Sequence, residues 1–239
     1  FVEQRVHDYY ERKNFPEKHR GVFTGFPTLD TILNGIKPGE LWLFGARANV
    51  GKSTILNVVA HNAFLAGHNV MFVGLEMGLE QNACRFDSLY TGLPMSDIEH
   101  GQLTEEQEQI YEEKLSNLTF FQNKFLFPPM RSCRTIQDIE RTVLAVERKE
   151  NIKIDLLVVD YLGILKTNSA KKESKQHEVQ ELLAKELRDL GDPSRLNLAI
   201  VSAVQFNRMG VDRNREIGIE GVAGSDAIGH HADLLIRLI

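Results

Sequence analysis

The chain has 239 residues, of which 42% are hydrophobic and 26% are charged, and its formal net charge is -5 at pH 7. These values are typical of one globular α/β domain or two small ones, and they exclude a protein that coats nucleic acid through a uniformly basic surface. No apolar run approaches the roughly 20 residues of a membrane-spanning helix, and the 2 cysteines are too few for a disulfide framework, so we expect a cytoplasmic protein with no membrane partner.

The first 15 residues predict a short polar helix, followed by a linker over residues 16–20. The apolar side chains of this helix lie on one side of it: Val2, Val6, Tyr9 and Tyr10. We therefore expect a linker helix and linker in residues 1–20 and a separate folded domain in residues 21–239. The chain has no initiator Met and no signal peptide, so we expect a fragment or a processed chain.

From residue 21 onward, predicted strands alternate with predicted helices. Short, near-continuous apolar runs fit strands that are covered on both faces, and they occur at 41–45, 70–75, 155–160, 198–204 and 234–239. Helical spacing of apolar residues occurs at 53–66, 79–90, 104–115, 135–149 and 179–190, and T-E-E-Q at 104–107 predicts a capping box. This alternation predicts an α/β fold, a mostly parallel twisted sheet flanked by helices. Residues 166–176 and 207–225 are expected to form exposed loops.

A candidate phosphate-binding loop follows the first predicted strand. The pattern G-x-x-x-x-G-K-[ST] is matched by Gly51, Lys52 and Ser53, but its first glycine is replaced by Ala46. A chance GKS sequence is the alternative. The position between a strand and a helix favours the loop, because backbone N–H groups and the positive helix end then point at one spot. Alanine fits the first position if its φ is negative. The candidate nucleotide-binding residues are Ala46, Arg47, Ala48, Asn49, Val50, Gly51, Lys52, Ser53 and Thr54.

Polar side chains at the ends of other predicted strands supply the rest of a candidate site. The Lys52 ammonium can reach the β- and γ-phosphates, and the Ser53 hydroxyl can bind Mg²⁺ together with Asp160, which ends L-L-V-V-D. The carboxyl ends of parallel strands are where ligands bind in open α/β sheets. An aspartate in an ordinary turn is the alternative for Asp160.

Glu76 and Gln205 follow the strands at 70–75 and 198–204. Glu76 is a candidate base for the attacking water, and Gln205 a candidate hydrogen-bond donor to the γ-phosphate. Taken singly, each also fits an ordinary solvent-exposed side chain.

Several segments, in order, resemble the C-terminal ATPase domain of DnaB-type hexameric replicative helicases, which has the RecA-like P-loop NTPase fold. They are TGFPTLDTILNGIKPGEL, GARANVGKS, GLEM, IEHGQL, LLVVDYLGIL, VQFNR and GSDAIGHHADLLIRL. In that family the first loop position is also commonly alanine. The resemblance implies an ATP- and Mg²⁺-dependent helicase in which Lys52, Glu76, Asp160 and Gln205 take part in catalysis. Glu76 would be the catalytic base, Asp160 the Walker B acid and Gln205 the phosphate sensor.

The resemblance also implies that the two predicted loops face DNA in a central channel. The candidate DNA-binding residues are Lys171, Lys172, Lys175, Arg208, Arg213, Arg215, Gly224 and Ser225. A solvated lysine loop is the alternative for the first three. The implied partners are single-stranded DNA, other copies of the chain in a six-membered ring, a primase and a helicase loader. Movement would be 5′–3′, in a bacterial cytosol or a phage-infected host.

The chain departs from the family pattern at several positions. Ala48 stands where the family has proline, Gly163 where it has glutamine, and His230 and His231 where it has acidic or amide residues. We interpret the histidine pair as a helix surface or subunit contact, since adjacent histidines suit a single metal ion poorly. Arg237 lies too early in the pattern to be the arginine finger, which we expect beyond residue 239 in a domain cut at its C-terminal end.

Two other functions are compatible with these motifs. One is a RecA-like ATPase of the KaiC or RadA type, which binds DNA or switches state without unwinding. The other is a non-catalytic ring or loader-binding module with a degenerate site. The joint presence of Lys52, Ser53, Glu76, Asp160 and Gln205 argues against the second.

Overall fold

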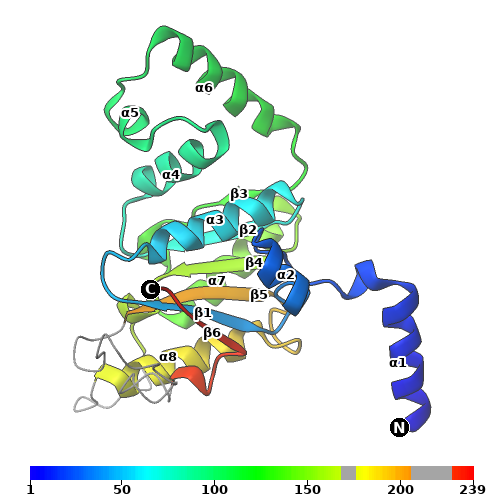
Figure 1. Ribbon diagram of the computed structural model, residues 1–239. Coiled ribbons are helices and arrows are strands. Elements are labelled where there is room, and N and C mark those ends of the chain that lie inside the picture. Colours follow the sequence, from blue (N-terminus) through cyan, green and yellow to red (C-terminus); the bar gives the residue numbers. More distant parts are fainter. Residues whose placement is uncertain (168–175, 206–227) are drawn as a thin grey trace.

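The computed structural model describes residues 1–167, 176–205 and 228–239. Within these ranges the strands form one 6-stranded sheet in the order β3-β2-β4-β5-β1-β6, and every strand pair in it is parallel (Figure 1). The strands are β1 (Leu41–Ala46), β2 (Val70–Gly74), β3 (Phe125–Leu126), β4 (Leu156–Asp160), β5 (Ala199–Gln205) and β6 (Leu234–Arg237). The predicted α/β class and mostly parallel sheet are confirmed.

The central strands are apolar throughout because helices cover both faces of the sheet. Every residue of β1 and β4 is buried. Along β1, Leu41 and Leu43 belong to one core cluster, while Trp42 and Phe44 belong to the other. This alternation follows from the period of two along a strand. It explains why the apolar runs in the sequence predicted these strands within one or two residues. The strand β3 was not predicted, because it pairs only through Phe125 and Leu126.

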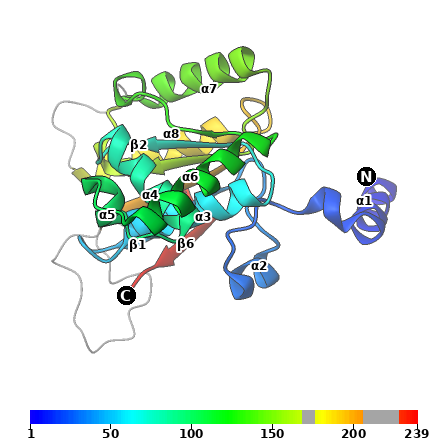
Figure 2. The ribbon, with the colours of Figure 1, turned by 90° about the horizontal axis from the view of Figure 1, so that it is seen from above.

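The two faces of the sheet carry different helices. Helix α3 (Lys52–Leu65) lies on one face, and α7 (Ile136–Glu150) and α8 (Gln176–Gly191) lie on the other (Figures 1 and 2). The remaining α-helices of the described residues are α1 (Val2–Asn14), α2 (Pro27–Leu33), α4 (Leu79–Thr91), α5 (Met95–His100) and α6 (Glu105–Asn117). Short 3-10 helices span Pro16–His19, Leu118–Phe120, Met130–Ser132 and Leu162–Ile164.

Helix ends follow local sequence signals where these are strong. The predicted capping box is present at α6, where the Thr104 hydroxyl accepts the Gln107 N–H and the Gln107 side chain accepts the Thr104 N–H. Thr135 and Asp138 form the same motif at α7. Helices α2 and α5 were not predicted, because 7 and 6 residues are too few to show a helical period.

Two parts of the chain project from the sheet. Helices α4, α5 and α6 form an extension beyond the edge that carries β2 and β3, and α1 lies apart on another side (Figures 1 and 2). Helix α1 has no buried residue. This placement agrees with a linker helix, while the division of the chain at residue 20 stays a prediction.

A buried aspartate fixes the segment that precedes β1. Asp30 lies in α2, and its carboxylate accepts hydrogen bonds from the Thr24 N–H at 2.9 Å, the Thr24 hydroxyl at 2.8 Å and the Gly25 N–H at 2.9 Å. Thr24 is fully buried, so its two donors have no access to water. Asp30 therefore fastens α2 to the turn at Thr24 and Gly25 that precedes the helix.

We expect Asp30→Ala to lower the free energy of unfolding by about 2 to 4 kcal/mol, because buried N–H and O–H donors lose their acceptor. Urea-induced unfolding followed by circular dichroism measures this change. Glu17→Ala, at an exposed carboxylate, is the control and should change stability by less than about 0.5 kcal/mol. Equal stabilities of the two variants would contradict the prediction.

Candidate nucleotide site

The loop between β1 and α3 has the backbone of a phosphate-binding loop. Strand β1 ends at Ala46 and helix α3 begins at Lys52. Gly51 caps the helix with φ 94, a conformation that favours glycine. Ala46 is the last residue of an extended strand, so alanine takes the place of the usual glycine there without strain, as expected. The N–H groups in the first turn of α3 have no partner within the helix and point toward the space that this loop encloses.

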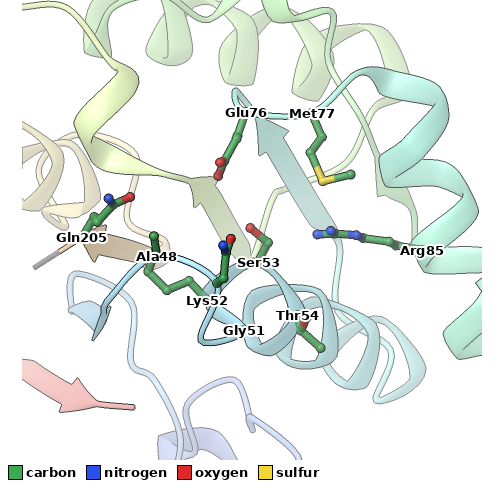
Figure 3. Close-up of a pocket in the computed structure, with 10 residues that line it drawn as sticks. Ala48, Gly51, Lys52, Ser53, Thr54, Glu76, Met77, Arg85 and Gln205 are labelled. Atoms are coloured by element: carbon green, nitrogen blue, oxygen red, sulfur yellow. The ribbon is translucent and has the colours of Figure 1, made fainter. Parts of the chain in front are cut away.

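This loop forms one wall of a cavity of about 330 Å³ (Figure 3). The cavity is lined by Ala48, Asn49, Gly51, Lys52, Ser53, Thr54, Glu76, Met77, Arg85 and Gln205. Most of the predicted nucleotide-binding residues are therefore brought together. Ala46, Arg47 and Val50 do not line the cavity.

Glu76 and Gln205 approach the loop from two other strands. Figure 3 shows the Glu76 carboxylate, just beyond β2, pointing toward the loop, and Gln205, at the end of β5, beside Ala48. The register of the sheet places Gln205 directly opposite Ala46. Segments far apart in sequence thus meet at the carboxyl edge of the sheet, as predicted.

Asp160 ends β4 and has only 1% of its surface exposed. The Ser53 hydroxyl donates a hydrogen bond to its carboxylate, while Oδ1 has no hydrogen-bond partner in the described part of the chain. Burial raises the pKa of Asp160 above its ordinary value of 3.8, and Glu76 adds to this. The Ser53 hydrogen bond and the charges of Arg85 and Lys52 act in the opposite direction. A buried carboxylate with a bare oxygen is a suitable ligand for a cation.

Lys52 is buried at the first position of α3, with 7% of its surface exposed. Its ammonium donates a hydrogen bond to the carbonyl oxygen of Arg47 at 3.0 Å. The positive charge therefore lies inside the curve of the loop, where phosphate oxygens would meet it together with the N–H groups of α3.

Arg85 is a cavity residue that the sequence analysis missed. It projects from α4 toward the cavity (Figure 3), its charge lowers the pKa of Asp160, and its Nη1 is buried without a hydrogen-bond partner in the described residues. An unpaired guanidinium N–H next to a phosphate loop is a natural phosphate ligand. The available signal was weak: Arg85 is the one basic residue of Leu79–Thr91.

The residues present fit a magnesium ion bound with a nucleotide. The described residues contain no group of three or more His, Cys, Asp or Glu side chains that could hold a metal by themselves. Mg²⁺ does not need such a group, since it is commonly held by one or two protein oxygens, phosphates and waters. The Ser53 hydroxyl and the bare Asp160 oxygen supply that kind of donor set.

Other predicted positions lie away from this cavity or outside the described residues. His231 Nε2 lies 3.6 Å from Glu181 Oε1 of α8, which supports a helix contact for this histidine. Arg237 lies at the end of β6, opposite Gly45. All candidate DNA-binding residues fall in 168–175 and 206–227, outside the described ranges.

The family model described as "DnaB-like helicase C terminal domain" matches residues 21–239. The chain belongs to this family. Replicative DNA helicase DnaB of Helicobacter pylori is 29% identical over 219 residues, which cover 91% of this chain and 43% of that protein. The corresponding protein of Haemophilus influenzae is 28% identical over 220 residues, covering 90% and 45%. The chain therefore spans less than half the length of these relatives.

Two solved structures share the fold. One is described by its title as an ATPase domain, with a TM-score of 0.82 at 18% identity over 99% of this chain and 82% of that chain. The other is titled "The Structure Of A DnaB-Like Replicative Helicase And Its Interactions With Primase", with a TM-score of 0.80 at 19% identity over 98% of this chain and 55% of that chain. The family match favours the helicase interpretation over the KaiC or RadA alternative. No helix in the described ranges has the length and apolar character to cross a membrane.

The raised pKa of Asp160 predicts a pH-dependent stability change on removing its charge. Above the raised pKa the buried carboxylate opposes folding, whereas below 3.8 the group is protonated in both the folded and unfolded chain. We expect Asp160→Asn to be more stable than the wild type at pH 7. This difference should shrink as the pH falls through the raised pKa and disappear below 3.8. Urea unfolding of both proteins over this range measures it, and a difference that grows toward acid pH would contradict the prediction.

Proposed function

We propose that this chain is the ATP-hydrolysing motor domain of a replicative DNA helicase. The observation that carries the proposal is the convergence of Lys52, Ser53, Glu76 and Gln205 on one cavity, with the buried Asp160 hydrogen-bonded to Ser53. The family match supplies the biological setting, because the named relatives are replicative DNA helicases.

The nucleotide would bind with its phosphates in the loop. The N–H groups at the start of α3 and the Lys52 ammonium would donate hydrogen bonds to the phosphate oxygens. Lys52 would then give up its hydrogen bond to the Arg47 carbonyl oxygen and form charged hydrogen bonds to phosphate instead. The Arg85 guanidinium would approach from the opposite wall of the cavity. Cationic groups on two sides would therefore fix the phosphate chain.

Hydrolysis would use the polar ends of β2, β4 and β5. Glu76 would orient and deprotonate the attacking water, and Gln205 would donate a hydrogen bond to the γ-phosphate. Ser53 and Asp160 would hold Mg²⁺, which when bound supplies charge neutralisation on the phosphates. Loss of the γ-phosphate would remove the Gln205 bond at the point where the chain enters residues 206–227.

We further propose the assembly and partners that this motor requires. Copies of the chain would form a ring, usually of six, in the cytoplasm and grip single-stranded DNA in its channel, moving 5′–3′. The side chains of Lys171, Lys172, Lys175, Arg208, Arg213 and Arg215, with the backbone of Gly224 and Ser225, would contact the strand. Such contacts carry little sequence information, which suits a motor that moves over any sequence. A primase and a helicase loader are the proposed protein partners.

Substitutions of Lys52 and Glu76 test the site directly. We expect Lys52→Ala to abolish both ATP binding and turnover, because the ammonium neutralises phosphate charge. We expect Glu76→Gln to lower the turnover number at least about 100-fold while ATP still binds, because only water activation is lost. Phosphate release and fluorescent-nucleotide titration measure the two effects. Substantial hydrolysis remaining in both variants would refute the site.

Arg85 tests the part of the site that lies on α4. We expect Arg85→Gln to weaken ATP binding about 10- to 100-fold, since a charged hydrogen bond to phosphate is lost. Nucleotide titration at fixed ionic strength measures the change. Arg131→Gln, at an exposed arginine outside the cavity, is the matched control and should bind ATP like the wild type. Equal affinities of the two variants would exclude Arg85 as a phosphate ligand.

A RecA-like ATPase that does not unwind DNA is the alternative function. An unwinding assay on a forked-DNA substrate distinguishes it from a helicase. The helicase proposal expects ATP-dependent strand separation by the assembled ring, and native mass measurement with nucleotide identifies that ring. ATP hydrolysis by an intact ring without strand separation would favour the rival.

A further inference from the structure

A buried asparagine holds the turn that follows Glu76. We infer that Asn82 is a positioning residue for ATP hydrolysis: its side-chain amide fixes the turn at Met77 and Gly78 and so holds Glu76 toward the nucleotide cavity. This inference rests on the proposed function, which it deepens by naming a residue that acts through Glu76. Asn82 itself does not line the cavity.

The contacts of Asn82 all reach back toward β2. Only 2% of its surface is exposed, although it lies in the first turn of α4. Its Nδ2 donates hydrogen bonds to the carbonyl oxygens of Met77 and Gly78, each at 3.1 Å, and its backbone N–H also donates to Gly78 at 3.1 Å. One amide group therefore satisfies two successive carbonyls of the turn between Glu76 and the helix.

The same amide packs against the last residue of β2. A Cβ atom on Gly74 would lie 2.2 Å from Asn82 Nδ2, far closer than atoms can approach. Gly74 does not have a positive φ, so glycine is needed there for space. In the sheet Gly74 pairs with Asp160. Asn82 thus fits between the end of the strand that precedes Glu76 and the turn that follows it.

This arrangement fixes Glu76 from both sides. Glu76 is itself exposed, and within the described residues its side chain makes no hydrogen bond, so its direction depends on the backbone at Gly74 and Met77. Met77 and Arg85 line the cavity from the same segment. The phosphate loop belongs to β1 and α3 and has no bond to Asn82. Loss of the amide should therefore affect hydrolysis more than ATP binding.

The first test compares ATP turnover of Asn82→Ala, Asn82→Ser and the control Gln81→Ala at a temperature at which all are folded. We expect Asn82→Ala to lower kcat about 10- to 100-fold with KM within about threefold, because small misplacements of a reacting group cost this much. Asn82→Ser should retain intermediate activity, since a serine hydroxyl can bond the carbonyl four residues earlier, here Gly78. Gln81 is exposed, and in the described part of the chain its side chain donates a hydrogen bond only to Glu99, so Gln81→Ala should match the wild type. A wild-type kcat in Asn82→Ala, or an equal loss in kcat and ATP affinity, would overturn the inference.

Gly74→Ala provides a second route to the same effect. The added Cβ should displace the Asn82 amide and so lower kcat. In the Asn82→Ala background the amide is absent, so the Cβ no longer collides with it. We expect the double variant to be no slower than Asn82→Ala alone, a non-additive result typical of residues in contact. If the fold-losses in kcat of the two single variants multiplied in the double variant, the two positions would act independently, which would contradict the inference.

Hydrogen exchange tests the turn without relying on hydrolysis. We expect the amides of residues 76–80 to exchange faster in Asn82→Ala than in Gln81→Ala, without nucleotide, because the turn loses two hydrogen bonds. Unchanged exchange would overturn the inference even if the variant were slow. If the wild type exchanged as expected but did not hydrolyse ATP, the proposed function alone would fail.

Discussion

The site depends on the register of four neighbouring parallel strands. Strands β2, β4, β5 and β1 lie side by side, and their pairing sets Gly74 opposite Asp160 and Ala46 opposite Gln205. Each strand therefore ends at the same edge, and the polar residue that follows or ends it faces a shared space. The helices on both faces exclude water from the strands but leave this edge open, which is why the candidate site lies there.

Positive and negative side chains stand together at this edge of the sheet, and the positive ones suit a polyanion. Asp160 is buried at an energetic cost that the Ser53 hydrogen bond and the charges of Lys52 and Arg85 partly offset. Glu76 works against this balance, because a second carboxylate raises the pKa of both Asp160 and Tyr161. A nucleotide with its metal would bring negative charge to the two cations and positive charge to the two carboxylates. The site is thus complementary to the pair rather than to either component alone.

The sequence predicted the polar residues at strand ends and those of the G-K-S motif, and it missed the ones inside α4. Asp160, Glu76 and Gln205 each end or follow a buried strand, so their shared edge could be inferred from strand polarity, while Lys52 was found through the motif at the start of α3. Arg85 and Asn82 lie in α4, and which face of α4 meets the cavity depends on the direction in which that helix leaves β2. No local pattern encodes that direction. The short elements α2, α5 and β3 were not predicted for a related reason: their placement comes from tertiary contacts rather than from periodicity in the sequence.

The cavity is lined by the loop with helix α3, by the segment from the end of β2 into α4, and by Gln205 at the end of β5. The first part holds Lys52 and Ser53, and the second holds Glu76, Met77 and Arg85. The Ser53 bond to Asp160 and the pairing of β4 with β2 join them. Helix α4 also continues into the extension formed by α5 and α6 (Figure 1). In the proposed function, nucleotide binding would depend mainly on the first part and hydrolysis on the second, and the Asn82 amide lies where the second part joins β2.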